Sequence, residues 1–238
     1  MKAMRGETSR LPGRRESLAG LSAILAIVAT GTEVQANEPD FAAELYVGVS
    51  FPKFDIGKDF NGRSVYVGAK ETVLLPTMTQ DGLGWGASAG VVMGTRLVGG
   101  GVEFGYLRHA YEASFLDWRS TGTLHLVPLD VRGYLFPAAV LSPYVIVGGA
   151  FSWMSLEDCV IRSDGTEDAT FKVFGKHVGA GIMLNLPVHV FLRAEAVYRW
   201  IRFYSASIPG EDWAVLEPSA NASGVSYVVS AGYQWGGR

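Results

Sequence analysis

The chain has 238 residues, of which 48% are hydrophobic and 18% charged, with a net charge of −3 and a positive mean hydropathy. A soluble protein of this length usually carries more charge, yet outside the N-terminal region there is no apolar run of the roughly 20 residues that a membrane-spanning helix needs. These values exclude a helical membrane protein, and a mildly acidic chain without a basic cluster is not expected to bind nucleic acid.

The first 36 residues have the three parts of a cleaved export signal. Residues 1–16 carry five basic side chains against two acidic ones, an apolar run follows from Leu18 to Thr30, and Val34-Gln35-Ala36 places small residues at the positions that signal peptidase reads. We therefore predict a signal peptide at 1–36 and a mature part at 37–238. A single N-terminal anchor helix is the alternative, although its apolar run is short for a bilayer.

The rest of the chain divides into eight segments in which apolar residues alternate with small or polar ones. In the first segment, Leu45 and Val47 alternate with Glu44 and Tyr46. A period of two is typical of a β-strand with two different faces. The predicted strands are Phe41–Phe51, Gly84–Thr95, Val98–Ala110, Thr121–Phe136, Pro143–Trp153, Phe174–Asn185, Val188–Trp200 and Val225–Trp235.

Two of these segments have unusual features. Pro128 lacks an N–H for a strand ladder, so we expect a bulge or a strand end there. Pro143–Trp153 is nearly all apolar or glycine, so its pattern does not show which side chains share a face.

The links between the segments alternate in length. Long links lie at 52–83, 111–120, 154–173 and 201–224, and short ones near 95–98, 137–142 and 185–188. Each segment is also about long enough to cross a bilayer when tilted. Short turns on one side and long loops on the other are typical of outer-membrane barrels, so we predict an all-β fold, an eight-stranded antiparallel up-and-down transmembrane β-barrel. A soluble barrel is the alternative.

A strand-like stretch within the first long link, Ser64–Leu75, predicts a hairpin that extends the barrel above the membrane.

Aromatic residues recur near the predicted strand ends, where the two girdles of a membrane barrel lie at headgroup level. The predicted girdle residues are Phe51, Trp85, Tyr106, Trp153, Trp200 and Trp235. Ordinary core aromatics are the alternative interpretation.

Charged residues recur on the face predicted to point inward. They are Glu44, Glu103, Asp130, Arg132, Arg193, Glu195 and Arg199. An eight-stranded barrel is only wide enough for its own side chains, and unpaired buried charges are very unfavourable. We therefore predict a salt-bridge network that plugs the lumen. A channel for small solutes, with these ion pairs as its gate, is the alternative.

Several strand segments are of a recurrent type, notably GVEFGYLRH at 101–109, SPYVIVGGAFSW at 142–153, VFLRAEAVYRW at 190–200 and VSYVVSAGYQW at 225–235. With them the chain resembles the small outer-membrane β-barrel proteins of Gram-negative bacteria, the group of porin-like surface antigens and outer-membrane protein A-type barrel domains. The resemblance implies an outer-membrane location, contact with outer-membrane lipid and lipopolysaccharide, and help from the barrel-assembly machinery during biogenesis. Such proteins usually end on an aromatic residue, whereas this chain continues after Trp235, which leaves the register of the last strand open.

The resemblance specifies a fold more than an activity. We predict a non-enzymatic, monomeric barrel with a structural or surface-contact role carried by its extracellular loops. A small passive porin-like channel and a lipid A-modifying enzyme are the alternatives. Such an enzyme needs a serine, a histidine and an acid within reach of one another, and His109, His125, His177 and His189 form no His-x-Ser pair on the lipid-facing alternation. No catalytic residue, cofactor or metal site is predicted, and Cys159 lies among acidic residues that disfavour a thiolate.

Overall fold

The computed structural model describes residues 42–56, 59–67, 71–116, 118–162 and 165–236. The predicted signal peptide at 1–36 and Phe41, the first residue of the first predicted strand, lie outside these ranges.

The described residues form thirteen strands, more than the eight that the alternation predicts, so that count is not confirmed. In order, the strands are β1 (Ala42–Phe54), β2 (Arg63–Val67), β3 (Glu71–Leu75), β4 (Thr77–Gln80), β5 (Trp85–Gly94), β6 (Val98–Phe115), β7 (Trp118–Leu135), β8 (Leu141–Arg162), β9 (Gly165–Asn185), β10 (Val190–Trp200), β11 (Arg202–Ile208), β12 (Glu211–Asn221) and β13 (Gly224–Gly236). The extra strands β2, β3, β4, β11 and β12 lie in the long links at 52–83 and 201–224. A 3₁₀ turn, η1 (Pro187–His189), joins β9 to β10. In this part of the chain no helix is both long and apolar enough to cross a membrane.

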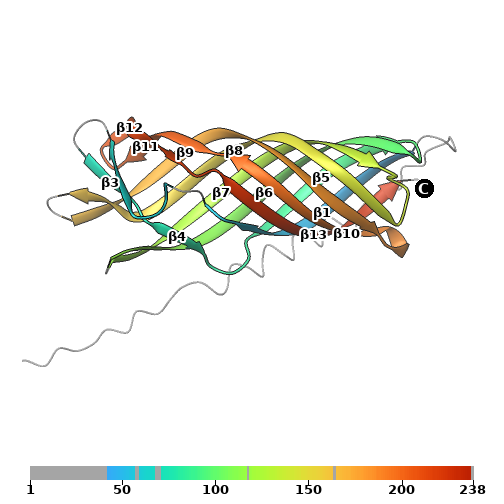
Figure 1. The fold of residues 1–238 in the computed structure, drawn as a ribbon, viewed down its shortest axis with the longest axis horizontal. Coiled ribbons are helices and arrows are strands. Elements are labelled where there is room, and N and C mark those ends of the chain that lie inside the picture. Colours follow the sequence, from blue (N-terminus) through green and yellow to red (C-terminus); the bar gives the residue numbers. More distant parts are fainter. Residues whose placement is uncertain (1–41, 57–58, 68–70, 117, 163–164, 237–238) are drawn as a thin grey trace, which may run out of the picture. The chain divides into compact units, whose positions relative to one another are not determined.

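Some of these strands pair in a closed cycle, which we call the wall. Its members are β1, β5, β6, β7, β8, β9, β10 and β13, each paired antiparallel with the next, and β13 pairs again with β1. Their tilted course is visible in Figure 1. Following the paired residues from strand to strand around the wall, from Leu45 of β1, leads back to β1 at Asp55. There the N–H of Asp55 donates to the Val225 carbonyl. This stagger of about ten residues is the shear that a tilted barrel requires.

Side chains alternate between the two sides of the wall as the sequence predicts. On β7, Leu129 and Val131 are 57% and 61% exposed, whereas Asp130 and Arg132 are buried. The facing of β8, which the sequence left open, follows the same rule: Val145 is exposed, and its neighbours are buried. The wall therefore has an apolar outside and a more polar inside.

Pro128 causes neither a bulge nor a strand end, so that prediction is wrong. β7 runs through Pro128, and the pairs with β6 on either side of it, Phe104 with Leu129 and Leu107 with Leu126, keep one register. Only the pairing with β6 is interrupted, while Pro128 still lies opposite Ala150 of β8. A missing N–H affects one side of a strand only, which explains why the strand continues.

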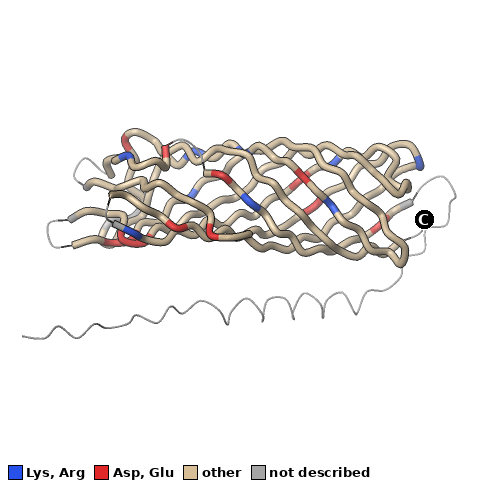
Figure 2. Tube along the Cα trace, turned by 60° about the horizontal axis from the view of Figure 1, so that its bottom comes forward, with Lys and Arg blue, Asp and Glu red and all other residues tan. Residues whose placement is uncertain are grey.

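The two ends of the wall differ. At the short-turn end, tight connections follow β5, β7 and β9. At the long-loop end, β2 and β3 form a hairpin, as the stretch 64–75 predicts, and its position above the membrane stays a prediction. Figure 2 shows charged residues gathered at the long-loop end and in the middle of the wall, with few elsewhere.

A second, smaller cycle of strands lies at the long-loop end, and we call it the mouth ring. It runs through β8, β9, β11, β12, β2 and β3 and closes back on β8. Its narrowest joints are β9–β11, β12–β2 and β3–β8, with two residue pairs each.

Candidate functional site

The charged residues inside the wall come mainly from three strands. β6 supplies Glu103, β7 supplies Asp130 and Arg132, and β10 supplies Arg193 and Glu195. Residues two apart on a strand share a face, so each of these strands presents its charges to the same interior.

Five of the seven charged residues predicted for the lumen are joined by ion pairs. The guanidinium of Arg132 donates to Glu103 Oε1 at 2.6 Å and to Glu195 Oε1 at 2.7 Å. Arg193 donates to Glu103 Oε2 at 2.6 Å and lies 3.8 Å from Glu195. Asp130 lies 3.3 Å from Arg132. Strands on opposite sides of the wall are thus connected through the interior.

His177 of β9 completes this group, which we call the charge cluster: Glu103, Asp130, Arg132, His177, Arg193 and Glu195. Its Nε2 lies 2.6 Å from Asp130 Oδ1. Every side chain in the cluster is less than 10% exposed. Three carboxylates therefore face two guanidinium groups and an imidazole, and removing either arginine would take an ion-pair partner from buried carboxylates.

Tyrosines hold the carboxylates of the charge cluster from both sides. The Tyr46 hydroxyl donates to Glu103 Oε2 at 2.7 Å, and the Tyr144 hydroxyl donates to Glu195 Oε1 at 2.7 Å. Each ring also lies 5.2 Å from a guanidinium carbon, that of Arg193 for Tyr46 and that of Arg132 for Tyr144. Such cation–π contacts restrict where the arginines can point.

Glycines leave the space that these side chains occupy. A Cβ on Gly90 would lie 2.5 Å from the Tyr46 hydroxyl, and one on Gly181 would lie 2.6 Å from Tyr144 Cζ. A Cβ on Gly148 would lie 2.7 Å from His177 Nε2. The glycines of the inner face are therefore matched to the bulky members of the site.

Arg199 and Glu44, the two other predicted lumen residues, are buried but take no part in the ion pairs above. Arg199 is 4% exposed, and its Nε and Nη1 have no hydrogen-bond partner within the described part of the chain. Both ring nitrogens of the buried His109 likewise lack a partner there. A polar layer of this kind suits ordered water.

Above these polar residues the mouth ring encloses an apolar core. Its buried side chains include Val65 and Val67 of β2, Phe171 of β9, Phe203 of β11 and Leu216 of β12. The core continues down to Leu124 and Leu126 of β7 and to Phe54 of β1. The interior therefore holds two different groups of buried side chains, charged ones in its middle and apolar ones at its mouth.

The six predicted girdle residues lie on the outside of the wall, at two levels. Phe51, Trp85, Tyr106, Trp153 and Trp200 lie toward the long-loop end, whereas Trp235 lies at the short-turn end beside Tyr233, with ring centroids 5.0 Å apart. Trp85, Tyr106 and Trp153 are neighbours, at centroid distances of 5.5 and 6.4 Å.

An apolar belt separates these two levels. It consists of exposed side chains such as Val102, Phe104, Leu129, Val131, Val145, Val147, Ile182, Leu192 and Val229.

The four histidines occupy different places. His109 and His177 point inward, His189 lies near Tyr233 at the short-turn end, and His125 faces outward, stacked on Trp153 at 4.7 Å. The hydrogen bond of His125 Nδ1 is to the Tyr106 hydroxyl, at 2.6 Å. Across the described residues no hydrogen bond joins any of the four to a serine hydroxyl.

Cys159 lies on β8, beyond the predicted girdle residue Trp153 and in the core of the mouth ring. Burial raises the pKa of its thiol to about 12, and the nearby carboxylates of Asp168 and Asp158 add to that effect. A buried, protonated thiol is a poor nucleophile.

Sequence reasoning missed Tyr46, Tyr144 and His177 as partners of the charges. Tyr46 and His177 occupy positions of their strands that the alternation turns inward. That signal could have identified them as lumen residues. Tyr144 lies in the segment of ambiguous facing, and which charge each residue meets depends on the stagger of the wall, which no local pattern shows.

A closed antiparallel sheet with an apolar outside and a charged inside defines a membrane-spanning β-barrel. Residues 22–234 match the profile of the family described as Outer membrane protein beta-barrel domain. The chain belongs to this family and is a bacterial outer-membrane protein. A comparison with curated proteins gives no match.

Several solved structures are similar to the chain at low identity. The attachment invasion locus protein Ail of Yersinia pestis is 12% identical over 82% of this chain and 99% of its own, with a TM-score of 0.44. OprG from Pseudomonas aeruginosa is 13% identical over 82% and 95%, with a TM-score of 0.45. A major outer membrane protein from Thermus thermophilus is 12% identical over 81% and 99%, with a TM-score of 0.48.

Proposed function

We propose that the protein is a closed, non-enzymatic barrel that serves the outer membrane as a structural and surface-contact protein. In this proposal the eight strands of the wall cross the membrane, and β2, β3, β4, β11 and β12 belong to the part outside it. The long-loop end faces outward, as long loops do in this class of barrel, and its exposed strands are the contact surface.

The observation that carries the proposal is the double filling of the interior. A solute entering at the mouth meets a core of side chains such as Phe171 and Phe203, which are fully buried. Further in it meets the charge cluster, in which Arg132 and Arg193 bridge β6 and β10. Moving either guanidinium would take an ion-pair partner from Glu103 and Glu195, whose carboxylates are buried.

The belt and the girdles support the position of the wall in the membrane. From Val98, the first residue of β6, to the predicted girdle residue Tyr106, the strand has nine residues, within the nine to eleven that a tilted strand needs to cross the hydrocarbon core. The outward side chains between those levels, such as Val102 and Phe104, are apolar.

Conductance in planar bilayers tests closure. We expect no single-channel steps from the full chain or from Arg119→Ala, a variant at the exposed tip of the β6–β7 hairpin. Steady steps that disappear on changing Arg132 or Arg193 would overturn the proposal and favour the passive channel.

The absence of enzyme activity is part of the proposal and has its own test. The hydrogen bonding of His125 to a tyrosine, rather than to a serine or a carboxylate, supports it. Incubation with lipopolysaccharide followed by mass analysis should leave lipid A unchanged. Loss or gain of an acyl chain that depends on His125 would refute this part.

We also propose that the signal peptide is removed after Ala36 and that the mature protein is a monomer. N-terminal sequencing of protein extracted from the membrane, and its mass in detergent by light scattering, test these two points. An intact N-terminus or a dimer mass would contradict them.

A further inference from the structure

A groove opens in the outer surface of the wall near the long-loop end, where two ladders fail to join. The pairing of β9 with β10 ends at Lys176 and Trp200, and the pairing of β9 with β11 begins again at Phe171 and Ala206. Between these pairs, described residues 172–175 have no strand partner on this side. The result is a groove of about 500 Å³.

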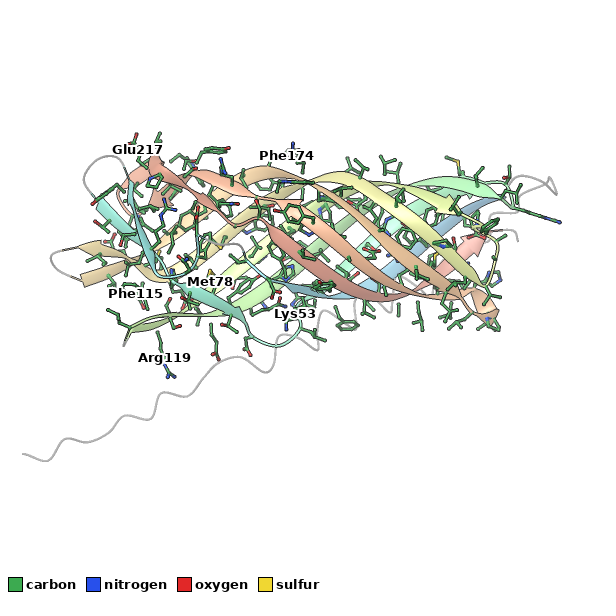
Figure 3. The ribbon with its side chains drawn as sticks, in the orientation of Figure 1. Lys53, Met78, Phe115, Arg119, Phe174 and Glu217 are labelled. Carbon is green, nitrogen blue, oxygen red and sulfur yellow. The ribbon has the colours of Figure 1, made fainter. Side chains whose placement is uncertain are left out.

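The groove has a positive and aromatic lining. Lys176 and Arg202 are its charged residues, and no carboxylate lies among the described residues that line it. Phe174, Tyr198, Trp200 and Tyr204 contribute rings, and Phe174 is 74% exposed and points away from the wall in Figure 3.

Among the described residues, no salt bridge includes Lys176 or Arg202. The carboxylate of Asp59 accepts a hydrogen bond at 3.0 Å from the backbone N–H of Asn221, a lining residue, but it also pairs with Arg63 at 3.0 Å. Asp59 is therefore already paired, and the described lining itself carries two positive charges and no negative one.

The height of the groove matches the boundary between lipid and water. Lys176 is the cross-strand partner of the girdle residue Trp200, and its ammonium lies 5.7 Å from that ring. Girdle residues lie at headgroup level, so a lipid phosphate at that depth would be within reach of Lys176.

A second cation lies further out on the same face. Lys172 is four residues from Lys176 along β9, roughly 13 Å at the rise of an extended strand. Its ammonium lies 4.2 Å from the centre of the Trp213 ring of β12. Lys172, Tyr204 and Trp213 are exposed, so this face offers a cation and ring surfaces well above the headgroup boundary.

We propose that this groove binds a phosphorylated glycolipid of the outer leaflet. Lys176 and Arg202 bind a phosphate at the boundary, Lys172 binds a second anionic group above it, and the rings of Phe174, Tyr204 and Trp213 pack against sugar. A phospholipid carries its phosphate at one depth only and would leave Lys172 and Trp213 without a contact. Basic pockets of membrane proteins bind lipid phosphates in this way, and aromatic neighbours fix the cations.

The test is a titration of the purified full chain in a neutral detergent, with bound lipid counted by native mass spectrometry. The probes are bisphosphorylated lipid A, phosphatidylglycerol and inorganic phosphate. The groove variant is Lys172→Gln/Lys176→Gln/Arg202→Gln. The matched control is Lys53→Gln/Arg108→Gln/Arg119→Gln, which removes three cations at the same end from β1, β6 and β7.

We expect the native chain and the control to retain one lipid A, and the groove variant to bind it at least about tenfold more weakly, since each basic residue near a lipid surface contributes measurably. Equal weakening in both variants, or none in the groove variant, overturns the site. Equal binding of phosphatidylglycerol, or displacement of lipid A by inorganic phosphate, overturns the assignment to a glycolipid.

The inference rests on the proposed orientation of the long-loop end toward the outer leaflet. Because the titration takes place in detergent and does not involve the lumen, its failure leaves the closed barrel intact. Conductance by the native chain would in turn leave the groove intact.

Discussion

Arg132 is the residue on which most of the interior contacts converge. Its guanidinium bonds Glu103 and Glu195, lies 3.3 Å from Asp130 and stacks on Tyr144. Because it is almost fully buried, its loss cannot be compensated by water at the surface.

Replacing Arg132 by methionine should therefore destabilise the barrel strongly. Methionine keeps much of the volume, but three buried carboxylates, those of Glu103, Glu195 and Asp130, lose a partner, and such losses cost about 3–5 kcal/mol. Urea unfolding followed by tryptophan fluorescence in detergent measures the change. Arg119→Met, at an exposed position, should stay within about 0.5 kcal/mol, and an equal effect in both variants would show that the ion pairs contribute little.

Gly181 offers a test of packing rather than charge. A Cβ there would lie 2.6 Å from Tyr144 Cζ and 2.8 Å from the Ala194 carbonyl oxygen. Gly181→Ala should therefore cost about 1–3 kcal/mol through overpacking. Gly133→Ala is the control, because a Cβ at that exposed glycine meets only Val145 Cγ2, at 3.5 Å. Equal unfolding midpoints for the two variants would contradict this account of the inner glycines.

At the scale of elements, the proposed closure depends on two independent obstacles, the hairpin of β2 and β3 in the mouth ring and the charge cluster within the wall. One variant replaces residues 61–76 with a short glycine–serine link. A second variant, Arg132→Ala/Glu195→Ala, removes an opposed pair of charges and leaves Glu103 with Arg193 and Asp130 with His177.

Neither variant alone should conduct in planar bilayers, and their combination should. Heat-modifiable gel migration checks that each variant is folded. Conductance after removal of the hairpin alone would show that the charge cluster does not block the lumen. Conductance from the charge variant alone would show that the mouth ring does not block the lumen.

The strands of the wall could be predicted because their alternation extends over ten or more residues, as in Phe41–Phe51 and Val225–Trp235. β11 and β12 could not, because their pairing shifts register twice. Thr77–Gln80 is only four residues long, too short for a period of two to stand out. These elements exist through their partners in the mouth ring rather than through a local pattern.

The same limit applies to the interior. The alternation of each strand places Glu103, Arg132 and Glu195 inside. Arg132 of β7, however, bonds Glu195 across the lumen, and β10 is not a neighbour of β7. That contact follows from the stagger of the wall, a property of all its strands together. The sequence could therefore predict which charges turn inward but not their pairing, nor that Arg199 lies apart.

At the scale of the whole molecule, a closed hydrogen-bonded cycle has no free edge from which detergent can begin to open it. The extracted protein should therefore migrate differently on gels before and after boiling, because only boiling unfolds the wall. Identical migration would count against a closed barrel in solution. Gly94→Pro, near the short-turn end, should lower the temperature of the change by removing an N–H from β5.

The mouth ring joins segments that lie far apart in the sequence and are therefore synthesised at different times. Val73 of β3 has to meet Val160 of β8, and Val67 of β2 has to meet Leu216 of β12, which comes much later in the chain. Closing such long intervals is slow and comes late. During assembly the wall would thus hold water at its long-loop end. That water would leave only when the hairpin of β11 and β12 forms and β12 pairs with β2.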